Sequence, residues 1–166
     1  MAVTASEMQM KILQALQEVK DPEIDTVSVI ELGMIESVYY ESGTAVIKVL
    51  PTFMGCPALE FIKKNIESAV LNLPGIDKAQ AEFVYTPPWT SDRVTEEGRE
   101  KLKEFGIAPP PKFFSEEGKW SVDCPYCGSA YTTMENIFGP TACRSILYCK
   151  SCKNPFEAMK PVSTLM

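Results

Sequence analysis

Four cysteines in two C-x-x-C pairs are the residues whose types and spacing most clearly suggest chemistry. Cys124 and Cys127 form one pair, Cys149 and Cys152 form the other, and 21 residues separate the pairs. A C-x-x-C pair on a tight turn can direct two thiolates at one ion, and two such turns complete a tetrahedral S4 site. The spacing therefore predicts a metal site. Zinc is the expected metal, with iron as the minor variant because thiolate quartets accept both.

Two alternatives to a metal site are a pair of disulfides and four unrelated buried thiols. The regular spacing of the four cysteines favours metal over both. A ribbon of this size can bury little apolar surface, so metal binding is expected to supply much of its folding free energy.

The remaining two cysteines are Cys56 and Cys143. Cys56 lies between a predicted strand and a predicted helix, at the N-cap of that helix or just before it. Free backbone N–H groups and the helix dipole stabilise a thiolate there, although a lone cysteine can equally be a small buried hydrophobe. Cys143 is a surplus thiol between the two metal-binding pairs.

Asp21-Pro22-Glu23 places two carboxylates around a rigid turn. Considered alone, this segment is most simply a helix stop with solvated acids, because the residue before proline avoids the helical region. The chain contains no histidine. This excludes Cys-His and Ser-His nucleophile pairs, Rieske-type ligation and the Glu-x-x-His pattern of di-iron carboxylate proteins. Any metal must be held mainly by sulfur or carboxylate.

The net charge of −6 is unevenly distributed. Residues 1–117 hold 11 Lys and Arg against 19 Asp and Glu, giving −8, whereas residues 118–166 hold 5 against 3, giving +2. Phosphate recognition needs a basic surface, so we expect no nucleic-acid binding. No apolar run is long enough for a membrane span and no signal peptide opens the chain, which predicts a cytoplasmic protein with reduced thiols and no membrane contact.

Hydrophobic periodicity predicts helices alternating with short strands before the cysteine-rich end. Ser6-Glu7-Met8-Gln9 is expected to be a capping box that opens a helix ending at Asp21-Pro22. Gly106 is expected to be the left-handed cap of the last helix. The stretch 26–30 is short and β-prone. The expected elements after the first helix are two strands in a hairpin, a helix, a strand and a helix, at 34–40, 44–50, 57–73, 79–85 and 95–105.

This order of elements predicts an α+β fold, with a small, mostly antiparallel sheet and helices packed on one face, followed by a small C-terminal zinc ribbon. The expected segments are a first domain over 1–107, a Pro-rich linker over 108–118 and the four-cysteine ribbon over 119–166.

Residues 7–107 resemble the domain shared by SufT-like proteins and cytosolic iron–sulfur targeting factors. The matching segments are Asp21-Pro22-Glu23, Leu32-Gly33-Met34-Ile35, Thr52-x-x-Gly55-Cys56-Pro57 and Pro87-Pro88-Trp89. With the ribbon included, the chain resembles the PaaD-like (PaaJ-like) small subunits of phenylacetyl-CoA 1,2-epoxidase systems. The motifs specific to that family are Phe138-Gly139-x-Thr141-Ala142-Cys143 and Cys149-x-Ser151-Cys152-x-x-Pro155-Phe156.

The resemblance implies a non-catalytic accessory subunit in phenylacetate catabolism that helps assemble or deliver iron–sulfur clusters. The implied partners are the other epoxidase subunits, especially the ferredoxin-like reductase. Cys56 and Cys143 are the implied ligands of a transient cluster, with Asp21 and Glu23 as a weaker option. A cluster usually takes four ligands, which a homodimer contributing both cysteines from each chain would supply.

Two other functions remain open at this point. The first is a thiol enzyme that uses Cys56 as its nucleophile, for which Lys63, Lys64 or Asp21 would have to act as the base. The second is a zinc-ribbon adaptor that binds protein and handles no cluster.

Overall fold

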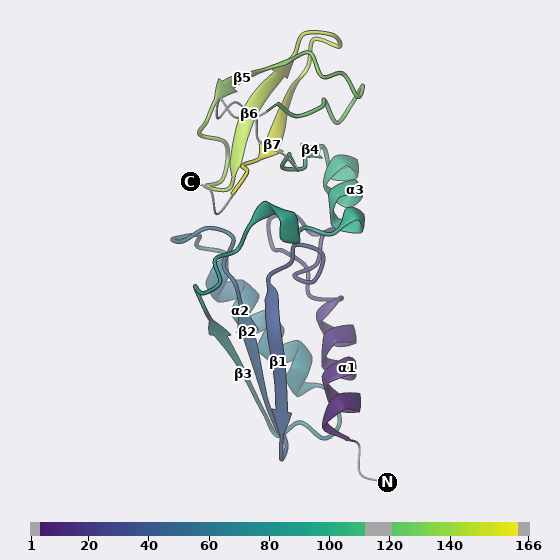
Figure 1. The fold of residues 1–166 in the computed structure, drawn as a ribbon, viewed down its shortest axis with the longest axis vertical. Coiled ribbons are helices and arrows are strands. Elements are labelled where there is room, and N and C mark those ends of the chain that lie inside the picture. The colour runs from purple at the N-terminus through teal and green to yellow at the C-terminus, as the bar shows by residue number, and fades with distance from the viewer. Residues whose placement is uncertain (1–3, 112–120, 163–166) are drawn as a thin grey trace. The chain divides into compact units, whose positions relative to one another are not determined.

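The computed structural model describes residues 4–111 and 121–162, and the chain forms two compact units, Met1–Trp89 and Thr90–Met166 (Figure 1). The predicted linker over 108–118 lies outside the described residues from 112 onward. Within the described residues, no helix is long and apolar enough to cross a membrane.

The first unit is a three-stranded sheet with two helices packed on one face (Figure 1). The sheet order is β1-β2-β3, with β1 and β2 antiparallel and β2 and β3 parallel. The parallel pair needs a crossover connection, which helix α2 provides. The elements are α1 (Ala5–Leu16), β1 (Ile35–Glu41), β2 (Thr44–Val49), α2 (Leu59–Leu71) and β3 (Lys78–Phe83).

Alternation along β2 divides the two faces of this sheet. Ala45, Ile47 and Val49 are fully buried, whereas the residues between them are half-buried. The helices contribute apolar residues at helical spacing to the same core. These buried helical residues are Met8, Ile12 and Leu16 on α1 and Ile62, Ile66 and Val70 on α2.

A helix side chain hydrogen-bonds to the backbone of each edge strand of the sheet. Gln9 on α1 donates from Nε2 to the Val38 carbonyl of β1 at 3.0 Å. Glu67 on α2 accepts from the Ala81 amide of β3 at 2.9 Å through Oε1. These bonds occupy edge groups that could otherwise pair with another strand.

Two local predictions for the first unit, the bounds of α1 and the start of α2, were wrong. The first helix begins earlier than expected, because Thr4 is the N-cap and forms the capping box with Glu7, and the helix ends at Leu16. The β-prone stretch 26–30 forms turns, with one isolated bridge between Lys20 and Ser28. Helix α2 begins at Leu59, two residues beyond Pro57.

The second unit is a four-stranded sheet preceded by a helix. The sheet order is β4-β7-β6-β5; the β4–β7 pair is parallel and the other two pairs are antiparallel. Thr95 caps the helix and Gly106 ends it at φ 92°, as the sequence predicted. The elements are η1 (Ser91–Arg93), α3 (Glu96–Phe105), β4 (Ile107–Ala108), β5 (Thr132–Asn136), β6 (Arg144–Cys149) and β7 (Pro155–Met159).

Segment 90–107, which the sequence pattern assigned to the first domain, is part of this second compact unit. The reason is visible in β4, because Ile107 and Ala108 pair with Glu157 and Ala158 of β7. The three-segment division of the chain at 107 and 118 stays a prediction.

Candidate metal centre and thiol sites

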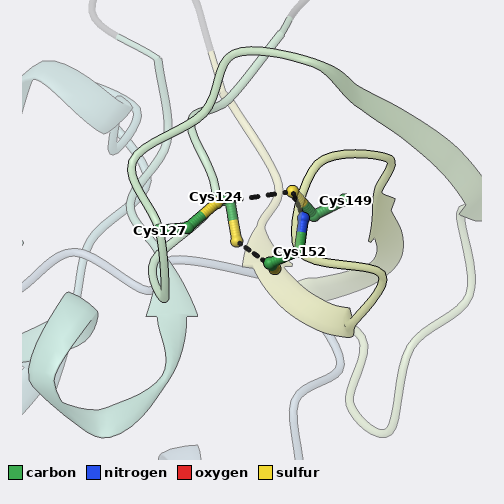
Figure 2. Close-up of side chains that lie close together, drawn as sticks. All are labelled: Cys124, Cys127, Cys149 and Cys152. Atoms are coloured by element: carbon green, nitrogen blue, oxygen red, sulfur yellow. Dashed lines mark hydrogen bonds between the residues drawn. The ribbon is translucent and has the colours of Figure 1, made fainter.

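The two C-x-x-C pairs meet at one end of the ribbon (Figure 2). Their four Sγ atoms all lie within 4.8 Å of one another. Cys124 Sγ lies 3.7 Å from Cys152 Sγ, and Cys127 Sγ lies 3.6 Å from Cys149 Sγ. A disulfide would need about 2.05 Å, so all four thiols are free. A tetrahedron with Zn–S bonds of about 2.3 Å has sulfur–sulfur edges of about 3.8 Å, so the four residues fit a tetrahedral ion.

The same backbone turn positions both pairs. The amide four residues after the first cysteine donates to that cysteine's carbonyl, from Gly128 to Cys124 at 2.8 Å and from Lys153 to Cys149 at 2.9 Å. Both donors have a positive φ, 74° at Gly128 and 63° at Lys153. The amide of each first cysteine in turn donates to the carbonyl five residues on, at 2.9 Å in both turns. The repeated geometry explains why two separate segments present matching thiols to one point.

The metal centre is continuous with the ribbon core. Cys124 and Cys149 are buried and belong to the same cluster as Leu147 and Phe156, whereas Cys127 is exposed. Burial raises the pKa of the Cys124 thiol. The backbone amide of Cys152, which lies 3.5 Å from Cys149 Sγ, lowers the pKa of Cys149 to about 6. A cation at the centre would stabilise the thiolate form of all four ligands.

A hydrogen bond that the sequence did not reveal joins the two turns. The Ser129 and Ser151 hydroxyls lie 2.7 Å apart. Ser151 lies inside the second pair and Ser129 follows the first, so their positions relative to the cysteines differ and spacing alone could not identify the contact.

Cys143 lies at the opposite end of β6 from the metal centre. Cys149 is the sixth residue after it. At about 3.3 Å per residue the two Cα atoms are roughly 20 Å apart, so Cys143 is not a fifth ligand of the same ion. Cys143 is half-buried, and its Sγ lies 3.2 Å from Thr141 Oγ1.

Cys56 belongs to the first unit, in the loop before α2, where it is half-buried. The sequence predicted Cys56 at the N-cap of this helix or just before it. The N-cap is Ala58, so Cys56 lies two residues before it. Gly55 has a φ of +80°, which favours glycine beside the thiol.

The acidic pair at residues 21 and 23 forms a turn. Asp21 Oδ1 accepts from the Glu23 amide at 2.8 Å and from the Ile24 amide at 3.1 Å. Across residues 4–111 and 121–162, the four-cysteine group is the one set of three or more cysteine or acidic side chains close enough to share an ion. Cys56, Cys143, Asp21 and Glu23 are therefore not gathered into such a set within the described part of one chain.

Two family models match the chain in succession. Residues 9–83 match an iron–sulfur cluster assembly protein family, and residues 108–160 match the PaaD zinc beta ribbon domain. The expected resemblance to both families is thereby confirmed.

Relatives with assigned names cover one or both parts. An Escherichia coli protein, named as a putative subunit of 1,2-phenylacetyl-CoA epoxidase, is 36% identical over 90% of this chain and 91% of that protein. The Bacillus subtilis Fe-S protein maturation auxiliary factor YitW is 34% identical over 51% of this chain and 82% of its own length.

Solved structures resemble the part of the chain that contains the first unit. A domain of unknown function from Bacillus anthracis has a TM-score of 0.54 at 29% identity and covers 59% of this chain and 93% of its own. A conserved hypothetical protein from Thermotoga maritima has a TM-score of 0.51 at 28% identity and covers 61% of this chain and 98% of its own.

Proposed function

The chain belongs to the PaaD-like family of 1,2-phenylacetyl-CoA epoxidase subunits, and from this premise we propose that it assembles or delivers iron–sulfur clusters for such an epoxidase. One observation carries the proposal. An iron–sulfur assembly domain and a PaaD ribbon occur in one chain, and a relative named as an epoxidase subunit matches across both. The role is accessory and non-catalytic, within phenylacetate catabolism.

The two kinds of cysteine divide the work in this proposal. Cys124, Cys127, Cys149 and Cys152 hold a structural zinc ion, which the sulfur geometry supports. Cys56 and Cys143 are the thiols that bind a transient cluster. A carrier must release its cluster, so ligands outside a closed four-sulfur site suit the task.

The ligand count points to a second copy of the chain. Cys56 and Cys143 supply two thiolates per chain, and a homodimer would supply the four that a cluster usually takes. Asp21 is the weaker option because its Oδ1 already accepts two backbone amides. Glu23 is the other carboxylate of that turn and shares the weaker role.

The partners in this proposal are the other epoxidase subunits, above all the ferredoxin-like reductase as the client that receives the cluster. The place of action is the cytoplasm. The uneven charge, with −8 on residues 1–117, supports protein partners over nucleic acid.

Cluster transfer tests the proposal. The full chain, loaded anaerobically with iron and sulfide, is mixed with the apo reductase, and the iron and sulfide on the reductase are measured. Cys56→Ser should transfer at least ~10-fold less than the wild type while keeping its zinc, because it removes a proposed cluster ligand outside the closed site. The matched control is Met54→Ser in the same loop, which removes a side chain that is 79% exposed and leaves the thiol.

Equal transfer by Cys56→Ser and the wild type would remove the main residue of the proposal. A wild-type chain that binds the reductase but never holds iron or sulfide would instead show an adaptor.

A further inference from the structure

We propose that residues 137–143, the β5–β6 loop, form the docking surface for the cluster acceptor, a protein with an apolar pocket bordered by carboxylates. The inference rests on the proposed function and names the surface by which the partner is recognised. It follows from the exposure, the hydrogen bonding and the charge of this loop.

Two adjacent apolar side chains on this loop face solvent. Phe138 is 76% exposed and Ile137 is 53% exposed. Leaving two large neighbouring apolar groups in water gains nothing for the folded chain, whereas exposed aromatic side chains are common anchors at protein interfaces.

The loop that carries them is held in one conformation by hydrogen bonds. Asn136 Oδ1 accepts from the Phe138 amide at 2.9 Å. The Gly139 amide donates to the Arg144 carbonyl at 2.9 Å, and the Arg144 amide donates to the Thr141 carbonyl at 3.2 Å. A preformed loop loses little conformational entropy when a partner binds, so its aromatic side chain can contribute fully to affinity.

Gly139 makes this conformation possible. A Cβ at residue 139 would lie 2.6 Å from the Arg144 carbonyl oxygen and 3.1 Å from the Ser145 amide nitrogen. Both neighbours are backbone atoms that cannot rotate away. A larger residue at 139 would therefore displace the loop and move Phe138 without removing it.

A cation next to Phe138 indicates the charge of the partner. Lys160 Nζ lies 5.6 Å from the centre of the Phe138 ring. No acidic residue occurs between 136 and 156, and Lys160 makes no ion pair within residues 4–111 and 121–162. A pocket that receives Phe138 would thus bring its rim against a positive charge, which favours carboxylates there.

The same loop carries the candidate thiol. Cys143 ends the loop, and its carbonyl accepts from the Lys160 amide at 2.8 Å. This hydrogen bond joins the residue before β6 to the residue after β7. It therefore fixes the positions of Cys143, Lys160 and Phe138 relative to one another. A partner that docks on Phe138 is brought to Cys143, so recognition and cluster transfer share one surface.

The ribbon offers a closely matched control at its other end. Tyr131 is 63% exposed, and Lys150 Nζ lies 5.1 Å from the centre of its ring. This pair has the same aromatic–lysine arrangement in the same unit, but it precedes β5 and is remote from Cys143. If binding depended only on the total exposed apolar surface of the ribbon, removing Tyr131 would weaken it as much as removing Phe138.

The test measures the Kd of the full, zinc-loaded chain for the epoxidase reductase, with zinc content and melting temperature as checks on folding. Phe138→Ala should weaken binding about tenfold or more, since anchor residues contribute on that scale. Gly139→Ala should also weaken it although Phe138 is still present. Lys160→Gln should reduce the dependence of the association rate on salt. Tyr131→Ala should stay within about twofold of the wild type, because Tyr131 lies outside the proposed docking surface.

Several results would overturn the inference. Phe138→Ala binding like the wild type, or Tyr131→Ala losing as much, would show that the loop is not the docking surface. Loss of a homodimer in Phe138→Ala with unchanged reductase binding would identify a second copy as the occupant. A wild-type chain that binds no reductase yet still holds iron and sulfide would refute the docking surface and leave cluster binding intact.

Discussion

The cysteines differ in their backbone surroundings, and the roles that we propose for them follow these differences. Cys124 and Cys149 each open a turn closed by two backbone hydrogen bonds, and their sulfurs converge with those of Cys127 and Cys152. Cys143 precedes the far end of β6. In the described residues it belongs to no group of three or more cysteine or acidic side chains that could share an ion. Residue type alone therefore does not decide between a metal ligand and a candidate transfer thiol.

Removing one metal ligand should unfold the ribbon. Cys124→Ser leaves three thiolates, two of them partly or fully exposed, and a ribbon with a small core depends on its ion for folding. We expect loss of bound metal and loss of the near-ultraviolet circular dichroism of the second unit. Cys143→Ser is the control, and it should keep both. Retention of one metal ion by Cys124→Ser would contradict a four-cysteine site.

The Trp89 indole tests the value of a buried hydrogen bond. Its Nε1 donates to the Leu32 carbonyl at 2.8 Å, and the side chain is buried. Trp89→Phe leaves that carbonyl without its donor and should lower the free energy of unfolding by about 1–3 kcal/mol in urea titration. Tyr40→Phe removes an exposed hydroxyl that donates to the Gly75 carbonyl at 3.0 Å, and should cost less. Equal losses of unfolding free energy in the two variants would show that burial does not make the Trp89 hydrogen bond more valuable.

At the scale of elements, hydrophobic periodicity predicted most of the helices and strands of the first unit. The capping patterns predicted the helix ends less well. The hairpin, α2, β3 and α3 were expected from alternation and helical spacing, and the structure confirms them with shifts at their ends. The N-cap of α1 was placed two residues late, because Ser6 with Gln9 satisfies the capping pattern as well as Thr4 with Glu7 does. The sequence cannot choose between these two overlapping capping patterns, because only the backbone conformation shows which residue precedes the helix.

The true cap of α1 can be identified by mutation. Thr4 accepts from the Glu7 amide at 3.3 Å through its hydroxyl, whereas Ser6 lies inside the helix. Thr4→Ala should lower the free energy of unfolding of the first unit by about 1 kcal/mol. Ser6→Ala should leave it unchanged or raise it slightly, since alanine is the better helix former. If chemical denaturation showed a larger loss of stability for Ser6→Ala than for Thr4→Ala, Ser6 would be the N-cap, as the sequence predicted.

The capping box should also depend on pH. The amide and the hydroxyl of Thr4 both donate to Glu7, which lowers the pKa of that carboxyl below its ordinary value. A depressed folded pKa means stability that is fully present above the unfolded value, about 4.3, and is lost as pH falls through the folded pKa. The difference between wild type and Thr4→Ala should therefore shrink in acid. A difference that grows below about pH 4 would contradict this linkage.

At the scale of the whole molecule, the sequence predicted the convergence of the four cysteines, whereas the boundary between the compact units depends on long-range strand pairing. C-x-x-C spacing is typical of a shared S4 site, so the sequence alone predicted that these four thiols meet, as the structure shows. The boundary near Trp89 depends on the pairing of Ile107 and Ala108 with Glu157 and Ala158 of β7, a contact between residues far apart in the sequence. The docking loop was also missed, because exposure of Phe138 cannot be inferred from its residue type.

Cluster handling is the central claim, and metal and sulfide content tests it most directly. The full chain is purified without oxygen, reconstituted with iron and sulfide, and analysed for zinc, iron and acid-labile sulfide per chain. We predict one zinc ion that reconstitution leaves in place, together with labile iron and sulfide that fall sharply in Cys56→Ser and Cys143→Ser. One zinc ion alone, unchanged by reconstitution in the wild type, would contradict the account.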